Sequence, residues 1–257
     1  MKHAIAAATV LLLLGFAGPP SVHAQREGGA PPSAQDSALI DLTGYWVSYV
    51  TENWRYRMVT PPKGEYRRIP VTPAAVPILN AWDPVADERA GNQCKSYGTG
   101  NIMSVPGRLH ITWQDADTLR VDTDAGTQTR LLRFRLREAS AGQVSARAAA
   151  PGARTWQGES SANWERAPGP GGGGGLRVVT SNLRAGYLRK NGVPYSERAT
   201  VSEQFDLAPL PGGGQLLLVT TTVEDPVYLR LPYVVSPHFK KEPDGSKWDP
   251  TPCSSTW

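Results

Sequence analysis

The sequence predicts an all-β fold: a single antiparallel, up-and-down barrel of about 9–10 strands with one or two short helices. Apolar and polar residues alternate along many short segments, which is the period of a half-buried strand. Turn-forming residues separate these segments at short intervals. Helical periodicity is scarce, and so many antiparallel strands in one domain leave no exposed edge only if the sheet closes.

The individual strands follow from this alternation. In Arg108–Trp113, for example, the apolar residues fall on one face and the polar residues on the other. The remaining segments that read in the same way are Gly44–Val50, Trp54–Val59, Leu119–Thr123, Gln128–Arg137, Thr155–Trp164, Leu176–Leu183, Thr200–Leu207, Gln215–Glu224 and Tyr233–Ser236.

Turns and helices complete the element list. The glycine run Gly171–Gly175 lacks the Lys-Ser/Thr and the helix of a phosphate loop, so we interpret it as a flexible hairpin tip. Asn-Gly within Lys190–Val193 favours a type I′ hairpin turn. The helix candidates are short, near Pro73–Asn80 and near Pro84–Ala90.

The N-terminus has the pattern of a secretory signal peptide. A short positive start precedes an uncharged stretch, Ala4–Ala17, and small residues stand at Val22 and Ala24. The alternative, a membrane anchor, needs about 20 apolar residues, and this stretch is shorter. We therefore expect residues 1–24 to be cleaved after Ala24, and a periplasmic or secreted protein that does not span the membrane.

The mature chain is expected to form one domain. Residues 25–38 are rich in Gly, Pro, Ala and Ser and are interpreted as a disordered lead-in to a domain over 39–257. The formal net charge of +4 is mild, and the basic residues are spread along strands. Nucleic-acid binding is therefore not expected.

Two cysteines, Cys94 and Cys253, remain after cleavage. In an oxidising compartment we expect them to form a disulfide that pins the C-terminal tail. A reactive thiol pair or metal ligands are the alternative, but the two residues are far apart in sequence and neither belongs to a C-x-x-C pattern.

Two resemblances bear on the fold. Gly44-Tyr45-Trp46 resembles the Gly-x-Trp of lipocalin and calycin barrels, in which the Trp packs at the closed end. The Thr-Asp-Tyr element of lipocalins is missing, since Thr222–Tyr228 departs from it. A longer resemblance, carried by stretches such as Glu52–Gly64, Gly107–Trp113 and Gly186–Glu197, is to an uncharacterised family of secreted bacterial proteins. It implies export and a β-rich fold.

Few residues suggest chemistry. The mature chain has two histidines, His110 and His238, and no closely spaced ligand pair, so neither a metal nor a cofactor is expected. His110 lies on the polar face of its strand. It is a candidate general base if that face lines a pocket, and inert if the face meets solvent.

Glu203 shares the apolar face of its strand with Val201 and Phe205. A buried carboxylate is costly unless it is paired or neutral. Glu203 therefore either meets an arginine inside the barrel or serves a ligand, with a raised pKa that suits acid/base chemistry.

Arg55 and Arg57 share one face of the strand predicted at Trp54–Val59, and Trp54 and Tyr56 share the other. The two guanidinium groups could clamp a ligand carboxylate, pair with Glu203 or Glu224, or face water. The aromatic residues are ligand-binding candidates on the same grounds.

Three functions remain open. The first is a barrel that binds a small, partly apolar ligand in its interior. The second is an enzyme of the lyase, isomerase or hydrolase type, in which His110 and Glu203 converge in one pocket. The third is a structural, envelope-associated protein. No nucleophile elbow, Rossmann loop or Walker loop is present to favour a particular reaction.

Overall fold

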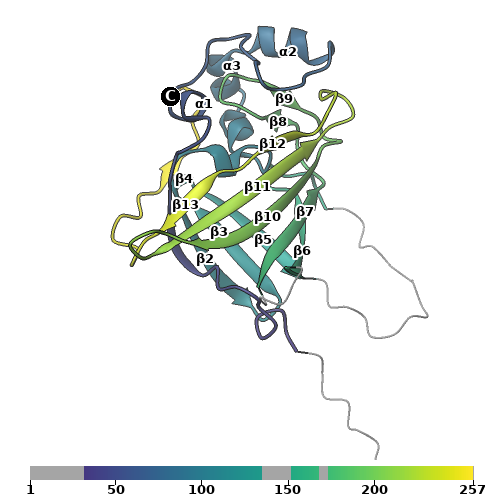
Figure 1. The fold of residues 1–257 in the computed structure, drawn as a ribbon. Coiled ribbons are helices and arrows are strands. Elements are labelled where there is room, and N and C mark those ends of the chain that lie inside the picture. Colours follow the sequence, from purple (N-terminus) through teal and green to yellow (C-terminus); the bar gives the residue numbers. More distant parts are fainter. Residues whose placement is uncertain (1–31, 135–151, 168–172, 257) are drawn as a thin grey trace, which may run out of the picture. The chain divides into compact units, whose positions relative to one another are not determined.

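The computed structural model describes residues 32–134, 152–167 and 173–256, and within them nine strands close into a barrel (Figure 1). The order around the barrel is β10-β7-β6-β5-β3-β2-β1-β13-β11, and pairing of β10 with β11 closes it. The strands are β1 (Gly44–Ser48), β2 (Arg108–Asp115), β3 (Thr118–Thr123), β5 (Gln128–Phe134), β6 (Glu159–Arg166), β7 (Gly174–Ser181), β10 (Thr200–Pro209), β11 (Gln215–Glu224) and β13 (His238–Lys241).

The all-β prediction is confirmed, but the up-and-down topology is wrong. β5 and β6 run parallel, with Leu132 opposite Ser160. The strand order also departs from the sequence order, because β1 lies between β2 and β13. A parallel pair needs a long connection that returns the chain to the same end of the sheet. That connection includes residues 135–151, which lie outside the described part.

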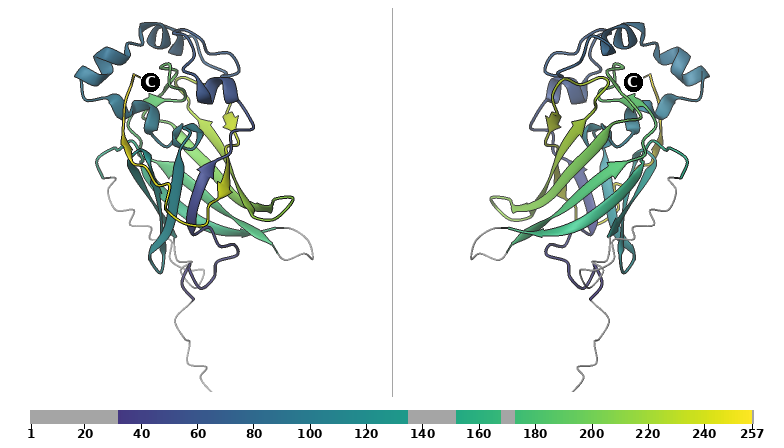
Figure 2. Two further views of the ribbon diagram at one scale, coloured as in Figure 1. Left: turned by 90° about the vertical axis from the view of Figure 1, so that its left-hand side faces the viewer. Right: turned by 90° about the vertical axis from the view of Figure 1, so that its right-hand side faces the viewer.

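Short helices gather at one end of the barrel (Figure 2). They all come from the chain between β1 and β2: α1 (Trp54–Met58), α2 (Ala75–Ala81), α3 (Pro84–Arg89) and the 3₁₀ turns η1 (Gln93–Tyr97) and η2 (Ile102–Ser104). The strand predicted at Trp54–Val59 is therefore wrong. The same end carries the short strands β8 (Gly186–Tyr187), β9 (Pro194–Tyr195) and β12 (Tyr233–Val235).

A polar layer divides the buried interior into two apolar clusters. Along β10, Phe205 belongs to the barrel cluster and Val201 to the cluster beside the helices. Glu203 lies between them and is opposite Thr221 of β11. A second buried polar contact lies beside it: the hydroxyl groups of Ser160 and Thr180 are 2.8 Å apart, with Thr180 opposite Val201. The barrel interior is therefore occupied by the protein's own side chains.

The other end of the barrel is covered by the chain that precedes β1 (Figure 1). The Trp164 indole donates a hydrogen bond to the Ala34 carbonyl, and the Ala34 amide donates to Asp117 Oδ1. The last residues of the expected lead-in thus contact the barrel. Residues 1–31, with the expected signal peptide, lie outside the described part. No helix among the described residues is both long and apolar enough to cross a bilayer.

Candidate functional site

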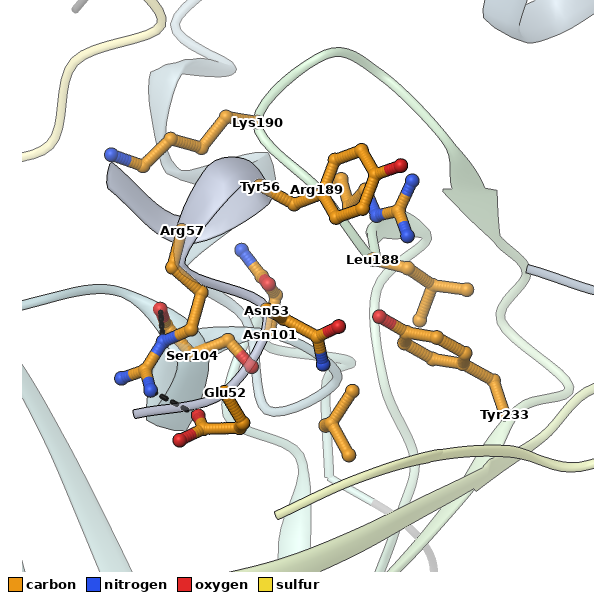
Figure 3. A pocket seen from close by; sticks show the side chains of 11 residues that line it. Glu52, Asn53, Tyr56, Arg57, Asn101, Ser104, Leu188, Arg189, Lys190 and Tyr233 are labelled. Atoms are coloured by element: carbon orange, nitrogen blue, oxygen red, sulfur yellow. Dashed lines mark hydrogen bonds and ion pairs between the residues drawn. The ribbon is translucent and has the colours of Figure 1, made fainter. Parts of the chain in front are cut away.

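A small pocket lies where the helical segments meet the barrel (Figure 3). Four separate stretches of chain form its wall: α1 with the two residues before it, the η2 region, the turn between β8 and β9, and β12. The lining residues are Glu52, Asn53, Tyr56, Arg57, Asn101, Ser104, Leu188, Arg189, Lys190, Tyr233 and Val235.

The pocket is narrow inside and open outside. It contains about 410 Å³ of space, part of which is continuous with solvent, and its enclosed part has room for about one water molecule. A group of several atoms therefore enters the enclosed part only if the lining side chains shift.

Arg57 anchors one side of the pocket. It is 4 % exposed, its Nε donates to the Ser104 carbonyl at 2.9 Å, and Nη1 donates to the Glu52 carboxylate. Its Nη2 is buried and has no hydrogen-bond partner. Burial lowers the pKa of Arg57, and the negative charge of Glu52 opposes this effect. Figure 3 shows this guanidinium on the Glu52 side of the pocket.

Arg189 forms the opposite side. It is 5 % exposed and its guanidinium carbon lies 4.0 Å from the centre of the Tyr56 ring, a cation–π contact. Its Nη1 is buried and has no hydrogen-bond partner. Among the residues that the structure describes, no carboxylate lies close enough to Arg189 to form an ion pair. The side chain is thus a buried cation without an anionic partner.

The turn between β8 and β9 positions Arg189. The Gly192 amide donates to the Arg189 carbonyl at 3.2 Å, and Gly192 has a φ of 81°. A Cβ at Gly192 would lie 2.3 Å from the Trp82 ring, so glycine is required here. Asn191 does not have a positive φ, which excludes the type I′ turn predicted from Asn-Gly.

Two further groups in the pocket have shifted pKa values. Burial lowers the pKa of Lys190 to about 8. Burial raises the pKa of Tyr233, and the charge of Arg189 beside its hydroxyl partly offsets this rise. At neutral pH the pocket therefore contains the positive charges of Arg57, Arg189 and Lys190 and one carboxylate, that of Glu52.

The ligand-binding residues predicted from sequence divide into two pairs. Tyr56 and Arg57 line this pocket. Trp54 is 64 % exposed, and Arg55 is exposed as well. A joint clamp by Arg55 and Arg57, one of the three alternatives left open by the sequence, required the two-residue period of a strand. In the helix α1, side chains two residues apart point to different sides of the helix, so Arg55 and Arg57 do not face the same ligand.

The structure does not bring the two predicted catalytic residues together. Glu203 is fully buried inside the barrel, where its carboxylate accepts two hydrogen bonds from Arg130, one of them 3.0 Å long. This is the arginine partner that we expected as one alternative. His110 alternates with the buried Leu109 and Ile111 and so faces outward.

His110 is held in an aromatic stack on the outer wall. Its ring is stacked on Tyr45 with centroids 4.1 Å apart, and Trp248 of the C-terminal tail packs edge-on against both rings. His238 lies elsewhere, with its Nδ1 2.9 Å from the Thr51 hydroxyl and 3.8 Å from a Glu52 oxygen. In the described residues, no three His, Cys, Asp or Glu side chains are grouped so that they could hold a metal ion.

The predicted disulfide between Cys94 and Cys253 is confirmed, with Cα atoms 5.1 Å apart. It joins η1 to the C-terminal tail. In the same region β14 (Thr251–Pro252) pairs in parallel with β4 (Ala125–Gly126). The tail is therefore tied to the outside of the barrel by covalent and backbone contacts.

Two other hollows are less suited to binding. One, at the end covered by the chain before β1, lies between Trp113, Trp164 and residues 38–42 and is open to solvent. The other is a shallow polar strip on β7, β10 and β11 that includes Arg177, Ser202 and Thr220. Neither contains a side chain with a buried polar atom that lacks a partner, whereas the pocket beside α1 contains two.

Sequence reasoning missed Arg130 and Arg189. Arg130 carried a signal, because it is in phase with Leu132 and Phe134 on the inward face of its strand. Arg189 carried none, because it belongs to an irregular turn. The comparisons add no relative: the chain matches no known family model, no curated protein and no solved structure. The closed barrel is consistent with the resemblance to lipocalins and does not identify a family.

Proposed function

We propose that this protein is exported and binds a small, partly apolar molecule in the pocket between α1, the β8–β9 turn and β12. One observation carries the proposal: four separate stretches of chain converge there and present buried polar atoms without partners beside apolar side chains such as Leu188 and Val235. Binding sites combine apolar walls with a few orienting polar groups in this way.

Two further features support the proposal. The barrel interior is filled by side chains such as Trp46, Ile111 and Leu132, each fully buried, so a ligand is better accommodated at the mouth of the barrel than inside it. The disulfide suits an oxidising compartment, as the expected export requires. An acid/base enzyme has less support, because His110 and Glu203 lie on opposite faces of the barrel wall.

Native mass spectrometry of the exported protein tests the proposal. We expect a mass excess that disappears on denaturation and corresponds to a retained small molecule. The variant Val235→Phe fills the pocket and should reduce the bound fraction at least tenfold. Val234→Phe, at the neighbouring position with a 55 % exposed side chain, is the matched control and should leave it unchanged.

Folding must be checked beside binding, because overpacking at Val235 costs about 1–3 kcal/mol. If Val235→Phe does not give the barrel's circular dichroism spectrum, Ser104→Phe takes its place, since Ser104 lines the pocket from a different stretch of chain, η2. Equal ligand retention by folded pocket variants and by Val234→Phe would show that the molecule binds elsewhere and would refute the proposal.

A further inference from the structure

We infer that the molecule bound in this pocket carries an oxyanion, a carboxylate, phosphate or sulfate group, and that Arg189 binds it. The inference rests on the proposed function, because it names the chemistry of the same pocket. Its basis is the charge environment of Arg189, a cation that the fold buries without an anionic partner.

Burial of a guanidinium is costly unless an acceptor replaces the water it has lost. The other two deeply buried arginines that take part in ion pairs show the usual solution: Arg130 pairs with Glu203, and Arg57 with Glu52. Arg189 is buried to a similar extent and has the Tyr56 ring and the Tyr233 hydroxyl as neighbours instead.

The acid whose pKa responds to Arg189 is already engaged. Glu65 is close enough for the charge of Arg189 to contribute to the lowering of its pKa, but the larger effect comes from Arg67. Glu65 and Arg67 form an ion pair of 2.7 Å on the surface. Among the described residues, therefore, neither a carboxylate nor a carbonyl accepts a hydrogen bond from Nη1 of Arg189.

The lining of the pocket fits an oxyanion. Arg189 offers a planar fork of N–H donors, which matches the oxygens of carboxylate, phosphate and sulfate. The Tyr233 hydroxyl and the Asn53 side chain lie in the same pocket and can donate further hydrogen bonds. The enclosed space has room for about one water molecule, so the lining has to shift to admit an oxyanion, with the apolar part of the ligand nearer the opening.

Access to Arg189 requires a movement of the pocket wall, because Nη1 is closed to solvent. Tyr56, stacked on the guanidinium face, can stay in place while an anion approaches in the plane of the N–H groups, or it can move with α1. Tyr56 belongs to a helix of five residues that has no side-chain N-cap and exposes Trp54 and Met58. Such a helix is held mainly by its tertiary contacts, here those of Arg57 with Glu52 and Ser104, and it shifts only when they open.

Calorimetric titration of the mature protein with sodium acetate, phosphate and sulfate, at constant ionic strength in chloride, is the test. We expect saturable binding of at least one of the three, and the preferred anion identifies the group. Arg189→Gln should weaken this binding at least tenfold. Arg189→Lys, which keeps the charge and loses the fork, should give an intermediate affinity.

Arg184→Gln is the matched control. Arg184 stacks on the Trp156 ring at the same 4.0 Å but is exposed and lies outside the pocket. It should bind the anion as the wild type does. If Arg184→Gln and Arg189→Gln weaken binding equally, or if folded wild-type protein binds none of the three anions, the inference is overturned.

The two proposals fail in different ways. A retained molecule that is neutral and binds equally to the wild type and to Arg189→Gln would refute the oxyanion inference and leave the binding function intact. Equal retention of the natural ligand by the Val235→Phe and Val234→Phe variants would refute the proposed function, even if Arg189 bound simple anions.

Discussion

At the scale of single residues, the buried charges of this protein fall into two classes. Arg130 and Glu203 neutralise one another's charge at the boundary between the two apolar clusters, with no exposed atom on either side chain, although Nε of Arg130 has no hydrogen-bond partner. Arg189 has no such partner. A buried charge with an ion-pair partner is neutralised within the fold. A buried charge without one can be neutralised by the opposite charge of a bound molecule.

The Arg130–Glu203 pair gives the first prediction. Glu203→Gln leaves an uncompensated guanidinium in the interior and should lower the free energy of unfolding by about 3–5 kcal/mol. Arg130→Met combined with Glu203→Leu replaces both charges with apolar groups and should recover most of that loss. Urea unfolding measures both. A double variant as unstable as Glu203→Gln would mean that the barrel requires the pair itself.

Lys190 gives a prediction about pH. Its pKa is lowered from 10.5 to about 8 by burial, so between pH 8 and 10 the unfolded chain holds a proton that the folded chain has released. Stability should therefore rise with pH in this window. Above about pH 10 it should fall, because burial raises the pKa of Tyr187, Tyr195 and Tyr233, and the folded protein keeps protons that the unfolded chain loses.

Thermal unfolding from pH 7 to 11 measures this profile. Lys190→Met should remove most of the rise between pH 8 and 10 and leave the fall above it; a smaller rise remains, because burial also lowers the pKa of Lys241. Lys240→Met removes an exposed lysine and should keep the wild-type profile. A rise of wild-type size in Lys190→Met would assign the proton to another group.

At the scale of elements, the sequence predicted those strands that a local alternation of apolar and polar residues defines. Alternation located β2, β3, β10 and β11 to within two residues at each end, because their inward faces are apolar. The same rule failed for Trp54–Val59, where aromatic and basic residues alternate without a buried face to enforce a strand. The parallel pairing of β5 with β6 was out of reach, because it depends on contacts between distant segments rather than on either strand alone.

The residues of the candidate site also divide into those that local sequence indicated and those that only the tertiary fold brings together. Tyr56 and Arg57 were selected for their chemistry, and the structure places both in the pocket although the element predicted for them is wrong. Arg189, Asn101 and Tyr233 come from other stretches of chain, and only the tertiary fold brings them beside α1. Their convergence leaves no periodic signal in the sequence.

The attachment of α1 is a property of the element and can be tested. Glu52→Gln removes the carboxylate that meets Arg57, and a hydrogen bond to a charged group contributes about 1.5–3 kcal/mol. Cleavage tracks the population of the open form, so trypsin should cut at Arg55 and Lys63 roughly tenfold faster or more. Glu165→Gln breaks a pair of exposed side chains at 3.6 Å and should not change the rate. Equal rates would mean that α1 is held by other contacts.

At the scale of the whole molecule, the C-terminal tail is attached to the outside of the barrel and adds no strand to its closed sheet. Hydrogen bonds between strands close the barrel without the tail. The tail crosses the outer wall, where Trp248 packs on Tyr45 and His110, and ends at the disulfide. A disulfide in this position is compatible with a compartment in which thiols are oxidised, and it adds a covalent bond to the backbone and aromatic contacts of the tail.

Removal of the disulfide should therefore cost stability and leave the barrel folded. The bond spans 159 residues, and in the chain-entropy model a loop of this length stabilises the fold by about 5 kcal/mol. Engineered disulfides often contribute less than this model predicts. We expect Cys94→Ser combined with Cys253→Ser to lose about 3–5 kcal/mol in urea unfolding. The circular dichroism spectrum should stay that of a β-barrel, because no barrel strand includes either cysteine.

Reductant provides the internal control. Because the chain has only these two cysteines, reductant should destabilise the wild type to the level of the double variant and should not affect the double variant. Tail release should also expose Trp248, so its contribution to the fluorescence should shift to longer wavelength in both reduced forms. If stability drops while the Trp248 environment is unchanged, the aromatic stack holds the tail without the disulfide, and the bond acts on the unfolded chain alone.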